Sequence, residues 1–139
     1  MIYGIGHDVL EIERVAAILQ RPHGERFMAR VLTAAEWDIA RRRAARQVEF
    51  VSGRFAAKEA ITKAFGCGIG KMIGFDDIEI LPDRLGKPNV VLSDAAWQRL
   101  GLQSDQRSYR VHLSISHQPH MAAAFAVVER LDRNGNDLP

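Results

Sequence analysis

Cysteine, long apolar runs and aromatic residues are all scarce in this sequence of 139 residues. The single cysteine, Cys67, cannot form an intrachain disulfide or a thiolate cluster for zinc, so we expect it to be a small residue at a helix end. No apolar run reaches the roughly 18 residues that a transmembrane helix needs, and the first residues lack the basic and apolar regions of a secretion signal. These absences predict a soluble cytoplasmic protein that does not interact with a membrane.

Aromatic residues make up only 7% of the sequence, and none of them lies in the arginine cluster RRRAAR at residues 41–46. The net charge of +2 and the pI of about 9.0 are typical of a protein with an acidic partner, either nucleic acid, a phosphorylated cofactor or an acidic protein. A surface that binds nucleic acid would place aromatic side chains between its basic ones, so we expect no nucleic acid partner. The simplest interpretation of the cluster is a solvated helix face.

The histidines and serines also lack the spacing of two common catalytic sites. The five histidines show no helical HExxH motif, which argues against a catalytic zinc site. His112, Ser114 and Ser116 alternate along the segment VHLSISH and so share one strand face, usually the solvent side. The sequence shows no partnered acid or oxyanion donor for a serine hydrolase triad, and that class is therefore not supported.

The hydrophobic periodicity predicts one α+β domain over residues 1–130, with helices first and antiparallel strands later, and a disordered tail at 131–139. Thr33 and Glu36 have the spacing of a capping box at a helix start. Gly4 and Gly6 lie in the first strand, where they indicate close approach of another backbone. The expected elements are a strand at 2–8, helices at 13–19, 25–31, 34–45 and 47–65, a hairpin within 75–93 connected by the five residues DRLGK, a helix from 94 to 100, and a strand pair at 108–118 and 121–129.

The segment RFAAKEAITKAFGCGIG at residues 54–70 is typical of a helix that ends at glycines. At about 100° per residue, one face is small and apolar and should be core, while Glu59 and Lys63 gather on the other face with Phe55 and Thr62. Glu59 and Lys63 are four residues apart, so a surface ion pair of about 0.3–0.5 kcal/mol explains them simply. The expected core face consists of Ala57, Ala60, Ile61 and Ala64.

A second interpretation of the same helix is a metal site. Asp8, expected at the end of the first strand, and Glu59 offer two hard oxygen ligands. Mg²⁺ is typically held by one or two carboxylates together with substrate phosphates, and Lys63 lies one turn from Glu59. The residue pattern alone leaves both interpretations open.

Four segments carry a family resemblance in a defined order: GIGHDVLEIERV, EFVSGRFAAKEAITKAFG, GKPNV and VHLSISH. Together they resemble the holo-acyl-carrier-protein synthases, the small bacterial family of phosphopantetheinyl transferases, over residues 2–130. The resemblance implies transfer of 4′-phosphopantetheine from coenzyme A to a serine of apo-acyl carrier protein, with release of 3′,5′-ADP, in fatty acid biosynthesis. It also implies that Asp8 and Glu59 are Mg²⁺ ligands and that Lys63 contacts the phosphates, which makes these three the expected catalytic residues. For Lys58 we expect a salt bridge that orients a ligand.

The resemblance further implies a groove for coenzyme A and a docking surface for the carrier. Arg46, our candidate for the 3′-phosphate, and Arg54 match basic residues near the coenzyme. The family is usually a homotrimer with sites between subunits, so we expect the late-chain groove residues to come from a different protomer than Arg46 or Lys63. The remaining expected groove residues are Gly66, Gly86, Lys87, Pro88, His112, Ser116 and His117. The expected carrier-docking residues are Arg14, Arg21, Arg26 and Phe27, with Met28 nearby.

Three other functions compete with this one. Transferases for polyketide or peptide-synthetase carriers that resemble the pseudo-dimeric class are about twice this length. A nucleic-acid-binding module would explain the pI, and a structural oligomerisation protein would need neither Asp8 nor Glu59. The sequence leaves open the preferred carrier, the general base, the use of Mn²⁺, and the roles of Cys67 and of His7, which lies beside a candidate ligand and could act in proton transfer.

Overall fold

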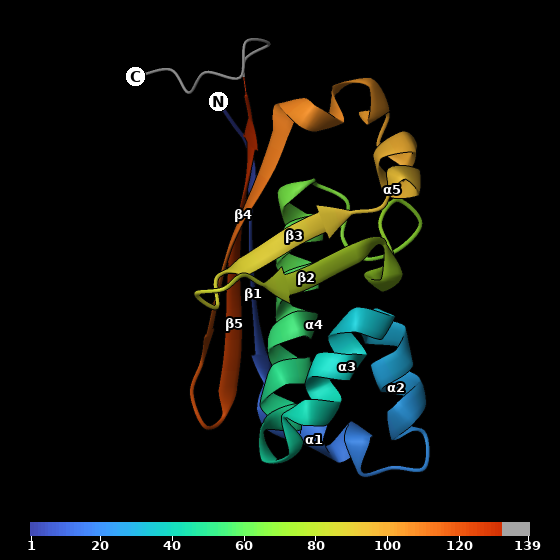
Figure 1. Cartoon of the computed structure of the whole chain (residues 1–139), viewed down its shortest axis with the longest axis vertical. Helices are drawn as coiled ribbons and strands as arrows, with labels where there is room; N and C mark the ends of the chain where they lie inside the picture. The colour runs from blue at the N-terminus through green and yellow to red at the C-terminus, as the bar shows by residue number, and fades with distance from the viewer. Residues whose placement is uncertain (132–139) are drawn as a thin grey trace.

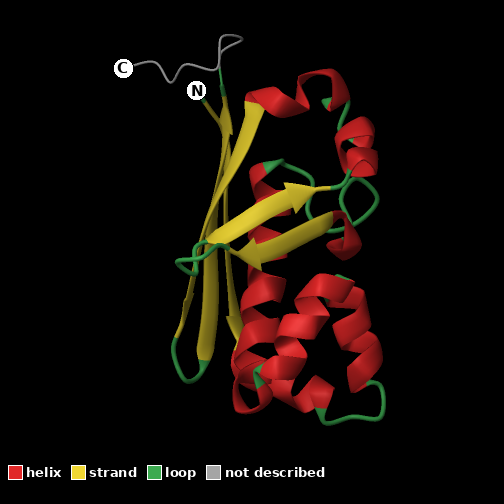
Figure 2. Ribbon diagram, in the orientation of Figure 1, coloured by secondary structure: helices red, strands yellow, loops and turns green. Residues whose placement is uncertain are grey.

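A three-stranded antiparallel sheet forms one layer of the protein, and helices cover one of its faces in the computed structural model, which describes residues 1–131 (Figure 1; Figure 2). The strand order is β1 (Ile2–Glu11), β5 (Met121–Arg130) and β4 (Tyr109–His117), so the first and last strands of the chain pair directly. The long helix α4 (Gln47–Ala64) packs against all three strands. The predicted α+β class is confirmed.

The remaining elements surround α4 at two levels. Helices α1 (Ile12–Leu19), α2 (Gly24–Val31) and α3 (Ala34–Arg42) gather around its N-terminal half (Figure 1). The separate hairpin of β2 (Ile78–Pro82) and β3 (Pro88–Leu92) crosses the middle of α4, with the five-residue connection that the sequence predicted. The other helical segments are α5 (Asp94–Arg99) and the 3₁₀ turns Ala44–Arg46, Phe75–Asp77 and Gln103–Ser108, the last of which the sequence analysis missed.

Two predicted boundaries are wrong. The first strand does not end at residue 8 but continues to Glu11, because Asp8 pairs with Ala124 and Glu11 still pairs with Met121. Asp8 therefore lies inside a strand, not at its end. The third helix ends at Arg42 instead of residue 45, because Ala44 has a φ of 36°, in the left-handed region that cannot continue a helix. The Thr33–Glu36 capping box at the start of α3 is confirmed.

Direct backbone contact joins β1 to α4. A Cβ on Gly6 would lie 1.7 Å from the carbonyl oxygen of Ala60, and one on Gly4 would lie 1.9 Å from that of Ala64. Only glycine has no Cβ, so these two residues allow the strand to touch the helix. The predicted close approach is confirmed, and it brings Asp8 alongside the part of α4 that carries Glu59.

Two apolar clusters hold the layers together. One lies between the sheet, α4, the hairpin and α5 and includes Ile61, Ile78 and Trp97. The other fills the space between α4 and the three early helices, around Val31 and Phe50. The predicted core face of α4 is confirmed, since the side chains of its four members are buried: Ala57, Ala60, Ile61 and Ala64.

None of the helices within residues 1–131 combines the length and apolar character needed to cross a bilayer. The expected disordered tail at 131–139 lies, apart from Leu131, outside the described residues. The tail thus stays a prediction, as does the boundary of the domain at residue 130.

We expect Gly6→Ala to destabilise the protein by about 3 kcal/mol or more, at the upper end of what overpacking costs, because the new methyl group would meet backbone that cannot rotate away. Gly70→Ala is the matched control, since nothing lies within 4 Å of a Cβ at that position. Urea unfolding of both variants measures the difference. Equal midpoints for the two would contradict the backbone contact between β1 and α4.

Candidate active site

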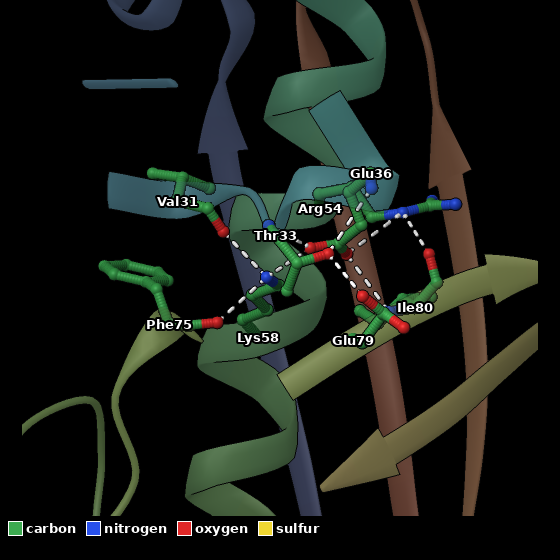
Figure 3. Close-up of polar contacts among 8 residues, drawn as sticks. All are labelled: Val31, Thr33, Glu36, Arg54, Lys58, Phe75, Glu79 and Ile80. Atoms are coloured by element: carbon green, nitrogen blue, oxygen red, sulfur yellow. Dashed lines mark hydrogen bonds and ion pairs between the residues drawn. The ribbon is translucent and has the colours of Figure 1, made fainter. Parts of the chain in front are cut away.

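The buried side chain of Lys58 fixes α4 to the surrounding elements (Figure 3). Its Nζ donates hydrogen bonds to Glu36 Oε1 at 2.6 Å, to the carbonyl oxygen of Val31 at 2.7 Å and to that of Phe75 at 2.9 Å. These three acceptors use all three N–H groups of the ammonium. Burial lowers the pKa of Lys58, and the carboxylate of Glu36 opposes that shift. The predicted salt bridge of Lys58 exists, but its partner is Glu36 and not a candidate metal ligand, because Lys58 points inward, about 100° around the helix from Glu59.

Glu59 and Lys63 project from the next face of α4 toward β1. Lys63 Nζ donates to Asp8 Oδ1 at 2.9 Å and to the carbonyl oxygen of His7 at 3.0 Å. The ion pair of Lys63 is therefore with Asp8, and the Glu59–Lys63 pair suggested by their spacing is absent from residues 1–131. Burial raises the pKa of Glu59, the negative charge of Asp8 raises it further, and Lys63 opposes both. The two carboxylates thus repel each other across a small space.

Asp8 and Glu59 open into a cleft of about 510 Å³ between β1, α1, α2 and α4. Two carboxylates that face one space suit a hard divalent cation such as Mg²⁺, which takes its other ligands from phosphate oxygens and water. In the part of the chain that the structure describes, no three His, Cys, Asp or Glu side chains form a complete metal cage. The donor set fits a metal that binds together with a phosphate-bearing substrate. Besides the two acids, this acidic cleft is lined by Val9, Leu10, Glu11, Arg14, Val15, Ile18, Phe27, Phe55 and Met121.

A second cleft, of about 230 Å³, lies where the N-terminal half of α4 meets the hairpin and the end of β4. Three arginines give it a positive lining, Arg43, Arg46 and Arg54. Burial lowers the pKa of Arg54 to about 10, with Glu36 opposing the shift and Arg43 adding to it, so the guanidinium is still charged at neutral pH. The other residues that line this basic cleft are Glu49, Phe50, Gly53, Pro82, Gly86, Pro88, Ile115 and His117.

Nine of the predicted site residues line one or the other of these two clefts. No residue lines both, and on α4 Arg54 and Glu59 are five positions apart, which rotates their side chains by about 140°. Arg46 and His117 line the same cleft of one chain, so they need no second protomer to meet, whereas the alternative that Lys63 and His117 come from different protomers stays a prediction. The acidic cleft holds Asp8, Glu59, Arg14 and Phe27, with Lys63 bound to Asp8, and the basic cleft holds Arg46, Arg54, Gly86, Pro88 and His117.

Several predicted site residues line neither cleft. His112 and Ser116 are exposed on the face of β4 turned away from α4, which confirms that the polar row is on the solvent side of this chain. His112 Nε2 lies 2.8 Å from Glu129 Oε2, a hydrogen bond on that face. The remaining ones are Lys63, which reaches the acidic cleft only through its ion pair with Asp8, Gly66, in the turn after α4, Lys87, in the hairpin, and the exposed Arg21 and Arg26.

Two residues whose roles the sequence left open have simple surroundings. Cys67 Sγ donates to the carbonyl oxygen of Thr62 at 3.6 Å, and burial raises the pKa of its thiol, so the side chain stays protonated. His7 is exposed, and its ring lies 6.1 Å from that of Phe125 on the outer face of the sheet. Both side chains are exposed, and neither lines the acidic or the basic cleft.

Arg43 and Glu49 are site residues that the sequence analysis did not select. Arg43 belongs to the RRRAAR cluster, whose uneven charge was a signal, but the cluster was interpreted as a solvated face. Arg43 is the C-cap of α3, and Ala44, with its positive φ, turns the chain directly after it. The carboxylate of Glu49 contacts the ring of His117 at the edge of the basic cleft. No sequence pattern predicts the turn at Ala44 or the contact between Glu49 and His117, which are far apart in the chain.

Comparisons with known proteins agree with one another. The sequence model of the 4′-phosphopantetheinyl transferase superfamily matches residues 4–126. The holo-[acyl-carrier-protein] synthase of Bacillus subtilis (strain 168) is 45% identical over 135 residues, which cover 94% of this chain and 98% of that protein. The solved synthase of Bacillus anthracis, in complex with CoA (3′,5′-ADP), is 42% identical with a TM-score of 0.77, covering 94% of this chain and 98% of that one. The synthase of Neisseria meningitidis is 37% identical with a TM-score of 0.81, covering 94% and 100%.

We expect Glu59→Gln to raise the Tm of the metal-free protein at pH 7 by about 1–4 °C, a small effect because the carboxylate is partly screened by solvent. Folding raises the pKa of Glu59, so the folded state binds its proton more tightly, and the wild type loses stability as the pH rises through that titration. The difference should therefore vanish at a pH below the ordinary range of a glutamate.

Thermal unfolding from about pH 3 to pH 8 with a chelator present measures this effect. Glu11→Gln, which removes an exposed carboxylate of the same cleft, is the matched control and should change little. A Glu59→Gln variant that is no more stable than the wild type at pH 7 would refute the repulsion between the two acids.

Proposed function

The chain belongs to the 4′-phosphopantetheinyl transferase superfamily, and from this membership we propose that it transfers 4′-phosphopantetheine from coenzyme A to a serine of apo-acyl carrier protein. The products are holo-acyl carrier protein and 3′,5′-ADP. The observation that carries the proposal is the convergence of Asp8, Glu59 and Lys63 at one cleft, beside a surface fit for an acidic protein. The relatives' names and the coenzyme in the Bacillus anthracis complex support the same substrates. Such a reaction belongs to fatty acid biosynthesis in the cytoplasm.

The residues of the acidic cleft divide the work of this transfer. The oxygen of the carrier serine attacks the phosphorus that bears pantetheine, and the phosphoanhydride bond to 3′,5′-ADP breaks. Asp8 and Glu59 would hold Mg²⁺, which supplies neutralisation of the negative charge on the diphosphate. Lys63 is half-exposed and bound to Asp8, so its ammonium lies at the edge of the site, where it contacts a phosphate oxygen. The three residues act by positioning and electrostatics, without a covalent intermediate.

Asp8→Ala and Glu59→Ala should each keep the fold and lower transfer by at least about 100-fold, comparable to the loss of one preorganised electrostatic contact. The assay incubates the protein with apo-acyl carrier protein, coenzyme A and Mg²⁺ and measures the mass of the carrier. Asp38→Ala, which removes an exposed carboxylate on α3, is the control. Unmodified carrier with the wild-type protein would overturn the proposed reaction, whereas near-normal turnover in either variant would overturn only the site.

We also propose that the enzyme is a homotrimer whose active sites lie between subunits. The acidic and basic clefts face different sides of α4, so a coenzyme held by both is completed most simply by two chains. The outer face of the sheet is apolar enough to be covered, since Ile5, Val9 and Phe125 are 54%, 45% and 47% exposed. In this arrangement one protomer supplies Asp8, Glu59 and Lys63, and its neighbour supplies the basic cleft. His112 and Ser116, on the outer face, then also meet a neighbour.

A mixture of Glu59→Ala and His117→Ala proteins should recover activity after subunit exchange, because some sites then combine an intact acidic cleft with an intact basic cleft. Each variant alone should be strongly impaired. Transfer assays before and after exchange, with exchange itself verified by mass-labelled subunits, measure the recovery. If exchange is complete and no activity returns, each site is built within one chain.

The proposed docking surface for the carrier is the α1–α2 side of the acidic cleft. Arg14 and Phe27 line this cleft together with the two acids, while Arg21 and Arg26 are exposed nearby. Arg14 forms no ion pair with its neighbours Glu11 and Glu13 within residues 1–131, where Glu13 contacts His120. A cation beside apolar side chains at the reaction site suits the acidic helix of a carrier, and complementary charge of this kind acts mainly on association rate.

A further inference from the structure

We propose that Glu36 is a positioning residue for coenzyme binding, because its buried carboxylate holds Arg54 with its guanidinium facing the basic cleft. This inference rests on the proposed function, in which the basic cleft binds the nucleotide part of coenzyme A. Glu36 itself lies in α3 and lines neither cleft. It acts on the ligand only through Arg54.

The carboxylate of Glu36 is fully buried and connects the start of α3 with α4 and β2 (Figure 3). Oε1 accepts hydrogen bonds from Lys58 Nζ and from the backbone N–H of Thr33 at 2.8 Å. Oε2 accepts one from the backbone N–H of Ile80 at 3.1 Å and lies 3.8 Å from Arg54 Nε. Because backbone groups and Lys58 fix both oxygens, the carboxylate presents its charge to Arg54 from a rigid position.

Arg54 contacts Glu36, Ile80 and Phe50, and it also lines the basic cleft. Its Nε donates to the carbonyl oxygen of Ile80 at 3.2 Å, and its guanidinium lies 4.4 Å from the centre of the Phe50 ring. No hydrogen bond within residues 1–131 uses its terminal nitrogens, which point away from Glu36 in Figure 3. The side chain is only 10% exposed, yet it lines the basic cleft. Its conformational entropy is therefore lost on folding and not on binding, which favours affinity for an anion.

The charges around Arg54 explain why this support is needed. Arg43 lies over the same Phe50 ring, 5.0 Å from its centre, so two guanidinium groups share one aromatic platform and repel each other. Glu49 also lines this cleft, but its carboxylate contacts His117 and makes no ion pair with Arg54 among the described residues. Among the described residues, Glu36 is the only carboxylate in an ion pair with Arg54. It offsets the repulsion that would turn Arg54 out of the cleft.

The test is a double-mutant cycle on the full-length protein, with 3′,5′-ADP as the probe and calorimetry as the readout. We expect Glu36→Gln to weaken the binding of 3′,5′-ADP about tenfold in the wild-type background. In the Arg54→Met background the same substitution should change the affinity by less than about twofold. A purely structural role would weaken binding equally in both backgrounds. Such an equal loss, or unchanged binding in a folded Glu36→Gln protein, would overturn the inference.

Two further variants control for the loss of a neighbouring carboxylate and for a failure of Glu36→Gln to fold. Glu79→Gln removes a neighbouring carboxylate that accepts a hydrogen bond from Thr33 and makes no ion pair with Arg54, so binding should stay within about twofold of the wild type. If Glu36→Gln does not fold because Lys58 loses its partner, the cycle uses Glu36→Gln with Lys58→Met, which removes both buried charges together. A wild-type protein that does not bind 3′,5′-ADP would overturn the proposed function itself, and this inference with it.

Discussion

The buried ion pair between Lys58 and Glu36 is the interaction on which the rest of the structure depends. It joins α4 to α3 directly, and through the other hydrogen bonds of its two members it reaches the end of α2, the turn at Phe75 and strand β2. Removing one member of such a pair leaves an uncompensated buried charge and typically costs about 3–5 kcal/mol. The same buried ion pair therefore fixes the positions of elements that form the basic cleft and of elements that form the acidic cleft.

Residues on different sides of helix α4 have different roles, because each position is rotated by about 100° from the one before it. Its alanines and Ile61 face the core, where small side chains let β1 approach. Lys58 points toward α3, while Glu59 faces the acidic cleft one residue later. Arg54 lies one turn before Lys58 on the same side of the helix and lines the basic cleft. A helix used on every face has no single apolar stripe, and in this case its position is fixed by specific polar contacts as well as by apolar burial.

The sequence predicted what depends on local spacing. The core face of α4, the Thr33–Glu36 capping box and the close approach at Gly4 and Gly6 follow from helical angles, hydrogen-bond geometry and the absence of a Cβ. The convergence of Asp8 with Lys63 came from the family resemblance, since no periodicity relates residues so far apart. The partner of Lys58, 22 residues away, and the placement of Arg43 by a left-handed Ala44 depend on tertiary packing and had no local signal.

Because β1 contacts α4 through Gly4 and Gly6, the backbones themselves set the distance between these two elements, and so the width of the acidic cleft between them. Where side chains separate two elements, each exchange of a core residue moves the elements slightly, and groups mounted on them drift apart. Where two backbones are in contact, the elements cannot move closer together, and no side chains are needed to fill the space between them. Asp8 and Glu59 stand on the two members of such a contact, so the core around them is free to vary in size and stability while the distance between the acids is conserved by geometry.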